Sequence, residues 1–262
     1  MTASTTFTQA FFERYSPEAF TGAEKAFFIK SLATRTSLML AGEGIHTFSP
    51  TAVLVSADAA GAATVAGDCD PAAAIAEACP AVTELSLAKN FLAEWGSVGQ
   101  IMSGFPLLTA LDVAFNAKLG ELGIGGCDGC SPRFLHLHTV NLRGCGVSFE
   151  CTGMQLLEGC PELKELDLSQ NKLVSFEAPS TDLVSTALTT LRLDDNHFGK
   201  GSGGFISTRS WNSVSIKVFP NLKTISLNGN KHLTTIDAAA LQAVGNADFC
   251  NVTNLYLSDT GM

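Results

Sequence analysis

The residues of this sequence with the strongest potential for chemistry are its cysteines, two of which have the spacing of a metal or redox site. Cys127 and Cys130 belong to a Cys-Asp-Gly-Cys segment, which is half of a zinc site or a redox pair. No second Cys/His pair with ligand spacing lies nearby, and no strand directly precedes the segment, as a thioredoxin-like motif requires. We therefore expect neither a metal site nor redox chemistry there, and reduced thiols throughout the chain.

Three other patterns invite a catalytic or ligand-binding interpretation, and each lacks a required part. Residues 199–204 read Gly-Lys-Gly-Ser-Gly-Gly, but a phosphate-binding loop needs Lys followed by Ser or Thr at the start of a helix, so we expect a mobile loop. The histidines form no pattern with a nucleophile, and no Gly-x-Ser-x-Gly is present. Asp194 and Asp195 carry the charges for a cation site, but adjacent strand residues point to opposite faces. We predict no enzymatic activity, no cofactor and no metal.

Composition indicates a folded chain and argues against two classes of partner. The 262 residues are 46% hydrophobic and 16% charged, which is typical of folded domains. The net charge of -9 and a pI near 5.0, without any cluster of Lys and Arg, argue against nucleic acid and anionic membranes. The amino terminus has no secretory signal pattern, and the Ala-rich segment 51–67 is too weakly apolar to span a bilayer. We expect a cytoplasmic protein.

A repeated leucine pattern is the strongest structural signal in the sequence. Within Leu163–Leu173, apolar residues occupy positions one, four, six and eleven and asparagine occupies position nine, which is the signature of a leucine-rich repeat. Leu166 and Leu168 alternate with polar residues, as on a short strand with one buried face. Asn171 marks the turn after the strand, where its amide can bond to backbone groups. One unit cannot fold alone, so further copies are required.

Copies of this pattern recur at intervals that leave room for a helix on the return path, and Trp95, Val98 and Met102 share one helical face. The expected strands centre on Leu85, Leu111, Val140, Leu166, Leu191, Ile225 and Leu255, after a degenerate first copy at 53–60. The expected structural ladder consists of Asn90, Asn116, Cys145, Asn171, Asn196 and Asn230. Two copies are irregular at position eleven, where Lys118 stands in one and Leu233 is displaced by one residue in the other.

These patterns predict an α/β leucine-rich repeat solenoid (horseshoe) with about eight parallel strands on the concave face and with helices and loops on the convex side. Residues 1–49 do not repeat, and Phe7, Phe11 and Tyr15 have helical spacing, so we expect a helical N-terminal cap. Residues 50–262 form the expected leucine-rich repeat domain. Met262 occupies the last apolar slot, so we expect this domain to be truncated at its C-terminal end.

The solvent-facing residues of the predicted concave sheet are the candidates for a binding site. Their charges are mixed, which suits a folded protein partner better than a polyanion. The candidate protein-binding residues are Ser86, Asp112, Phe115, Asn141, Arg143, Asp167, Arg192, Asp194, Ser226 and Tyr256.

Two segments are more specific than a generic repeat. Residues 76–95, with Ala-Cys-Pro near the start, Ala-Lys-Asn in the middle and Trp at the end, resemble the opening repeats of tubulin-folding cofactor E (tubulin-specific chaperone E). The closing Leu-Ser-Asp-Thr-Gly-Met of 257–262 is similar to a later repeat of that family. The resemblance covers roughly 76–262 in order and spacing. It implies a cytosolic, non-enzymatic factor that binds α-tubulin and works with other tubulin-folding cofactors to assemble or dissociate the αβ heterodimer.

The sequence departs from that family in one motif, and two alternatives stay open. The family often carries a CAP-Gly domain, whose Gly-Lys-Asn-Asp-Gly motif is absent here, and a ubiquitin-like domain, for which no residues remain. One alternative is a generic intracellular leucine-rich repeat adaptor or inhibitor, such as a relative of ribonuclease inhibitor. The other is a GTPase-activating relative, in which Arg143 or Arg192 would supply a catalytic arginine by analogy.

Overall fold

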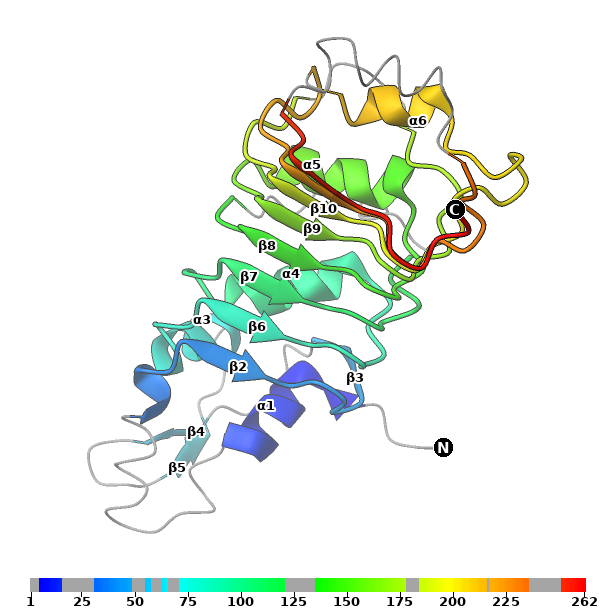
Figure 1. Ribbon diagram of the computed structural model, residues 1–262. Coiled ribbons are helices and arrows are strands. Elements are labelled where there is room, and N and C mark those ends of the chain that lie inside the picture. Colours follow the sequence, from blue (N-terminus) through cyan, green and yellow to red (C-terminus); the bar gives the residue numbers. More distant parts are fainter. Residues whose placement is uncertain are drawn as a thin grey trace.

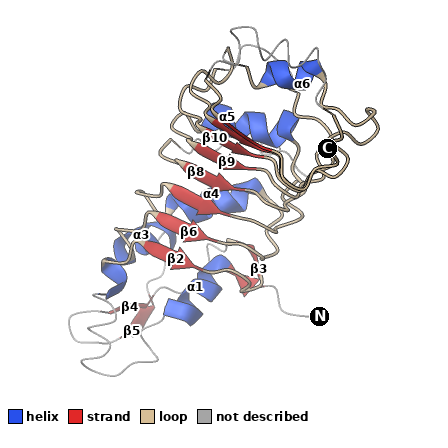
Figure 2. Ribbon diagram, in the orientation of Figure 1, coloured by secondary structure: helices blue, strands red, loops and turns tan. Residues whose placement is uncertain are grey.

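A computed structural model describes residues 5–15, 31–48, 55–57, 63–65, 71–120, 135–177, 184–215, 217–235 and 251–262. Within these ranges the chain forms a ladder of parallel strands with helices along one side (Figure 1). Figure 2 shows the same arrangement by element type, with the strands stacked in one direction and the helices behind them. The fold is an α/β leucine-rich repeat solenoid, as the sequence predicts. In the same ranges, no helix has the length and apolar character needed to cross a membrane.

The main sheet of the described residues has eight strands, and each strand pairs in parallel with the next one of the stack. They are β2 (Ser37–Met39), β6 (Glu84–Ser86), β7 (Ala110–Asp112), β8 (Thr139–Asn141), β9 (Glu165–Asp167), β10 (Thr190–Arg192), β11 (Thr224–Ser226) and β12 (Asn254–Tyr256). We refer to the repeats that begin with these strands as rows 1 to 8. The buried residue at the middle of each strand is in register with its neighbours, as Leu85 is with Leu111 and Leu166 with Leu191.

The first row lies earlier in the sequence than predicted. Row 1 is β2, whose Leu38 pairs with Leu85, so the sheet begins inside the segment expected to form a helical cap. The predicted copy at 53–60 is wrong as a row, because β4 (Val55–Ala57) pairs antiparallel with β5 (Ala63–Val65) in a separate two-stranded sheet. The prediction failed for two reasons. Alternation of apolar residues is common to parallel and antiparallel strands, so it does not distinguish them. Row 1 also has Glu43 where the repeat pattern expects asparagine.

A helix covers the end of the solenoid at row 1. In α1 (Phe7–Tyr15), Phe7 and Phe11 are fully buried, which agrees with the predicted helical packing of this segment. The Phe7 ring centroid lies 6.3 Å from that of Phe48 and 6.2 Å from that of Phe105. Just before the helix, β1 (Thr5–Thr6) pairs in parallel with β3 (Ile45–Thr47). The apolar layer of row 1 is therefore covered by aromatic side chains from the beginning of the chain.

Several return paths between strands contain helices. The predicted helix after row 2 is confirmed as α4 (Trp95–Ser103), which buries Trp95, Val98 and Ile101 against the sheet. The other described helices are α3 (Pro71–Ala78), the π-helical turn η3 (Phe149–Gly153), its continuation α5 (Met154–Gly159), and α6 (Thr208–Ser213). The predicted helix over 237–245 lies outside the described residues. One contiguous apolar core runs between these helices and the strands.

Buried amides at position nine join consecutive rows. The Asn196 Nδ2 donates to the Leu193 carbonyl of its own row at 2.9 Å and to the Leu168 carbonyl of the preceding row at 3.1 Å, while its Oδ1 accepts from the Leu173 N–H at 3.0 Å. Equivalent bonds are made by Asn90, Asn116, Asn171 and Asn230. These side chains satisfy backbone groups that water cannot reach.

The residue at position nine also determines which apolar side chain is buried at the end of the preceding row. Where the next row supplies an asparagine, its Oδ1 binds the N–H at position eleven and that side chain is buried, as for Leu92. Row 3 precedes Cys145, which has no amide, and here the chain turns one residue later. Lys118 is exposed, Leu119 fills the slot, and the Leu119 N–H bonds to the Asn116 carbonyl at 3.0 Å.

Row 7 repeats this arrangement and explains the second irregularity of the sequence. The next row has Thr260 at position nine, and the buried residue is Leu233, whose N–H bonds to the Asn230 carbonyl at 2.9 Å. Lys118 stands at position eleven of row 3 in the sequence, but the buried apolar residue at the end of this row is Leu119.

This displacement gives a direct test. We expect Leu119→Ala to lower the free energy of unfolding by about 2–5 kcal/mol, since it removes a fully buried side chain. Lys118→Ala should change the stability by less than about 0.5 kcal/mol, because this side chain is exposed. Urea unfolding followed by circular dichroism measures both variants. Equal losses would contradict the displaced position of the apolar slot.

Candidate protein-binding surface

The solvent-facing residue at the centre of the sheet forms one continuous column across all rows. Register pairs such as Asp112 with Asn141 and Asp167 with Arg192 place the predicted residues side by side. From row 1 to row 8 this central column consists of Met39, Ser86, Asp112, Asn141, Asp167, Arg192, Ser226 and Tyr256. Sequence reasoning missed Met39 because it placed row 1 in the wrong segment.

The side chains of the central column differ in solvent exposure, and therefore in their accessibility to a partner. Met39 is 53% exposed and Tyr256 is 50% exposed, and Arg192 is exposed between them. By contrast, Ser86 is 8% exposed and donates to Asp112 Oδ2 at 2.9 Å, and Ser226 is 3% exposed. The most exposed residues of this column therefore lie at its two ends and at row 6.

Three acidic or amide side chains in the middle of the column also end their strands. One oxygen of Asp112, Asn141 and Asp167 accepts the backbone N–H of the residue two positions later, at 3.1, 3.0 and 2.8 Å respectively. This local bond is an alternative to continuing the strand, which is why short polar residues favour turns. These side chains are half-buried, so each also presents polar atoms to solvent.

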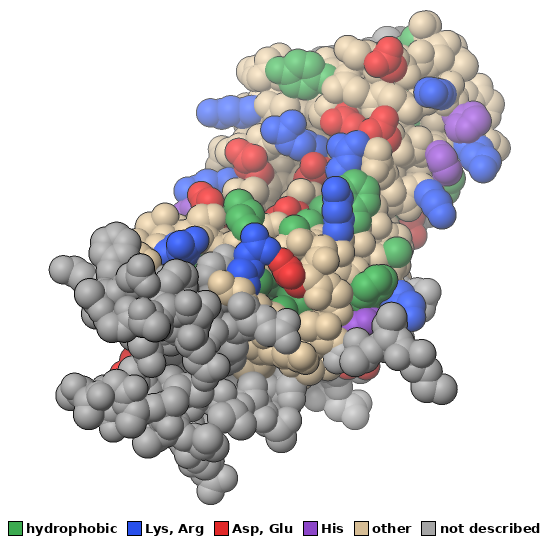
Figure 3. Space-filling model, turned by 90° about the horizontal axis from the view of Figure 1, so that it is seen from below, with side chains coloured by type: hydrophobic (Ala, Val, Ile, Leu, Met, Phe, Trp, Pro, Cys, Tyr) green, Lys and Arg blue, Asp and Glu red, His purple; other side chains and the backbone are tan. Residues whose placement is uncertain are grey.

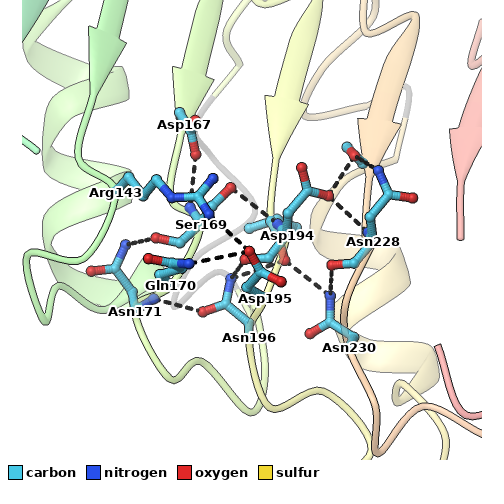
Figure 4. Close-up of polar contacts among 12 residues, drawn as sticks. Arg143, Asp167, Ser169, Gln170, Asn171, Asp194, Asp195, Asn196, Asn228 and Asn230 are labelled. Carbon is cyan, nitrogen blue, oxygen red and sulfur yellow. Dashed lines mark hydrogen bonds and ion pairs between the residues drawn. The ribbon is translucent and has the colours of Figure 1, made fainter. Parts of the chain in front are cut away.

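In rows 6 to 8 the backbone N–H at the corresponding position, two residues after the central column, bonds instead to a side chain of the preceding row (Figure 4). Ser169 Oγ accepts from the Asp194 N–H at 3.1 Å, Asp194 Oδ1 accepts from the Asn228 N–H at 2.7 Å, and Asn228 Oδ1 accepts from the Ser258 N–H at 2.8 Å. In row 6 the local bond seen in rows 3 to 5 is not possible, because the side chain of Arg192 cannot accept a hydrogen bond from the Asp194 N–H. Asp194 therefore joins two rows, in addition to facing solvent.

Asp194 and Asp195 line one cavity, which corrects the prediction that they point to opposite faces. The strand β10 ends at Arg192, and Asp195 has a φ of 54°, so the alternation of strand residues does not apply to them. The cavity has a volume of about 670 Å³ and is lined by Arg143, Asp194, Asp195, Asn228, Gly229, Lys231, Asp259 and Thr260. Arg143 lies 2.8 Å from Asp195 Oδ2, which also accepts from Gln170.

The charges around this cavity are mixed, and no group of three or more His, Cys, Asp or Glu in the described part of the chain could hold a metal ion. Arg143 is committed to the ion pair with Asp195, with a side chain that is 32% exposed. The arrangement suits contact with a charged protein surface.

A second column beside the first has left-handed backbone in every row. Its residues precede position nine and are Gly42, Lys89, Phe115, Gly144, Gln170, Asp195, Gly229 and Asp259, with φ between 54° and 75°. We call it the left-handed column. The N–H of this position donates to a carbonyl of the next row, as from Phe115 to Arg143 at 2.7 Å. Glycine adopts this conformation freely, whereas other residues cost about 1–2 kcal/mol each.

Two cysteines that the structure describes, Cys79 and Cys145, are buried. Burial raises the pKa of the Cys145 thiol to about 11, so the thiol stays protonated and donates to the Val113 carbonyl at 3.1 Å. Burial likewise raises the pKa of Cys79 to about 12. Cys127 and Cys130 lie outside the described residues.

Similarity to known proteins covers a large part of this chain but a smaller part of each relative. No family model matches the sequence. Over 166 residues the chain is 28% identical to the human Tubulin-specific chaperone cofactor E-like protein, covering 62% of this chain and 35% of that protein. It is 26% identical over 180 residues to Tubulin-specific chaperone E of Xenopus laevis, covering 60% of this chain and 33% of that protein. Human Tubulin-specific chaperone E is 25% identical over 176 residues. The chain thus spans about a third of these relatives.

Among solved structures, similarity is found to the leucine-rich repeat-containing protein LegL7 from Legionella pneumophila. The TM-score is 0.39 at 19% identity, with 72% of this chain and 69% of that chain covered.

Proposed function

We propose that this chain is a non-enzymatic protein-binding module of a tubulin chaperone, which binds α-tubulin and supports assembly or dissociation of the αβ-tubulin heterodimer together with other tubulin-folding cofactors in the cytoplasm. The observation that carries the proposal is the similarity of 60–62% of the chain to proteins named as tubulin-specific chaperones E and E-like. The resemblance of residues 76–95 and 257–262 to the same family supports it.

The arrangement of polar side chains supports a protein partner for this module. The exposed ends of the central column offer an apolar side chain at Met39 and an aromatic one at Tyr256, with both charge signs between them. Interfaces of folded proteins combine aromatic anchors with complementary charges in this way. The eight strands extend over about 34 Å at the usual strand spacing, which is long enough for a folded partner.

Binding of purified αβ-tubulin to this chain tests the proposal. We expect the triple variant Asp167→Lys, Arg192→Glu, Tyr256→Ala to weaken binding at least tenfold, because it reverses two charges and removes the aromatic end of the central column. Surface plasmon resonance with immobilised chain measures the dissociation constants.

Glu158→Lys is the matched control, since Glu158 is an exposed residue of α5, on the helical side of the solenoid. It should leave binding unchanged. Absence of tubulin binding by the unmodified chain would contradict the proposed function. Binding that survives the triple variant but is lost with Glu158→Lys would instead move the surface to the convex side.

A further inference from the structure

Rows 2 and 3 expose two phenylalanines on the turn edge of the sheet. Phe91 is 57% exposed and directly follows the ladder residue Asn90, and Phe115 is 41% exposed in the left-handed column. Large aromatic side chains normally gain free energy by burial, so an exposed pair on adjacent rows marks a contact surface more strongly than a single exposed residue does. The position of Phe91 holds glycine, alanine, lysine or histidine in the other rows.

The backbone of Phe115 strengthens this argument. Its φ is 60°, a conformation that is rare for bulky residues and that glycine adopts in three other rows of the same column. The Phe115 ring lies over the backbone of row 4, since a Cβ added at Gly144 would lie 2.7 Å from its Cδ1. The fold thus accommodates a strained aromatic residue where glycine would be relaxed, as happens at functional sites.

Neighbouring side chains contact the two rings, and one of them carries a positive charge. The His46 ring stacks on Phe91 with centroids 4.8 Å apart and planes inclined by 20°. The Lys89 Nζ lies 6.0 Å from the Phe115 ring centroid, within reach of a cation–π interaction. Figure 3, which views the molecule from the end where row 1 lies, shows exposed hydrophobic side chains among charged side chains of both signs.

The ammonium group of Lys89 is available to a partner. It makes no ion pair with any residue that the structure describes. The carboxylate of Asp112, which lies in the adjacent row, is already engaged: its Oδ1 accepts from the Ala114 N–H and its Oδ2 accepts from the Ser86 hydroxyl. An unpaired cation beside exposed rings attracts a ligand that brings a carboxylate together with apolar surface.

We infer that Phe91, Phe115, Lys89 and His46 form a docking surface for a protein segment in which acidic residues flank an apolar side chain. The apolar side chain contacts the two rings, and a flanking carboxylate pairs with Lys89. A nucleic acid could also stack on the rings, but it needs several phosphate contacts, and Lys89 is the single Lys or Arg among the four residues of this surface. This inference rests on the proposed protein-binding function but not on the identity of the partner.

A labelled synthetic peptide in which single phenylalanines are flanked by pairs of glutamates is the probe, and fluorescence anisotropy measures its affinity. Two control peptides carry alanine in place of phenylalanine, or lysine in place of glutamate. We expect the glutamate–phenylalanine peptide to bind at least about tenfold more tightly than either control. Equal affinity for the lysine peptide, tighter binding of oligothymidylate, or no peptide binding would overturn the inference.

Two variants of the full chain locate the site. Phe115→Gly should weaken peptide binding about tenfold while the chain stays folded, because glycine adopts a φ of 60° without strain. Lys89→Glu should invert the preference, so that the lysine peptide binds more tightly than the glutamate peptide. Leu107→Ser, at an apolar residue that is 55% exposed outside this surface, is the control.

Unchanged peptide affinity in Phe115→Gly would overturn the inference, with circular dichroism confirming that the variant is folded. The same preparations tested with αβ-tubulin separate the two proposals. Peptide binding without tubulin binding would contradict the proposed function alone, whereas tubulin binding without selective peptide binding would contradict the docking surface alone.

Discussion

Replacing Asn196 by alanine is expected to lower the free energy of unfolding by about 3–5 kcal/mol. The Asn196 side chain is 3% exposed and bonds to five backbone groups of two rows, two N–H groups and three carbonyls. Alanine leaves the Asn171 and Leu173 N–H groups without a partner in the interior, and an unpaired buried group costs about 1–3 kcal/mol. The Leu168 and Leu193 carbonyls still accept from the amides of Asn171 and Asn230, so the loss comes mainly from the two N–H groups.

Two variants provide the comparison for Asn196→Ala. Asn254→Ala removes an exposed amide whose Nδ2 donates only to Thr224 Oγ1 at 3.4 Å, and it should change stability by less than about 0.5 kcal/mol. Cys145→Ala removes a single thiol donor from the same ladder and should cost about 1 kcal/mol. Urea unfolding with circular dichroism gives all three values. A loss for Asn196→Ala no larger than that for Cys145→Ala would show that the amide bonds do not hold the rows together.

The sequence predicts most rows of the solenoid because the repeat has a strict internal spacing. Each copy with leucines at positions four and six forms a strand in the expected register, as Leu166 does with Leu191. Row 1 was not predicted, since Leu38 pairs with Leu85 although 46 residues and a hairpin lie between them. Such a long insertion obscures the repeat period of the sequence. In addition, row 1 has Glu43 at position nine, where asparagine would have identified the row.

The candidate surface is predictable where it follows from strand alternation and unpredictable where it depends on turns. Asp112 and Asp167 occupy the central column because every second strand residue faces the same way. The left-handed column could not be predicted, because Lys89, Phe115 and Gln170 are not residues that favour a positive φ. Only comparison with the glycine rows of the same column would have suggested it.

Two glycines of the Gly-rich segment 199–204, Gly199 and Gly204, pack against row 7. The Gly199 carbonyl accepts from the Gly204 N–H at 3.1 Å, and the Gly204 carbonyl accepts from the Thr234 N–H at 2.8 Å. A Cβ at Gly199 would lie 2.7 Å from the His232 carbonyl carbon and 3.0 Å from the Leu233 Cα. Glycine is therefore required here for close approach of two backbone segments, and not for binding phosphate.

Gly199→Ala and Gly201→Ala form a matched pair that isolates this close approach. Both glycines have positive φ, 86° and 79°, so alanine costs about 1–2 kcal/mol of backbone strain at either position. Only Gly199 meets the backbone of row 7, whereas a Cβ at Gly201 has nothing within 4 Å. We expect Gly199→Ala to lose at least about 3 kcal/mol of stability in urea unfolding and Gly201→Ala about 1 kcal/mol. Equal losses would mean that Gly199 does not pack closely on the backbone of row 7.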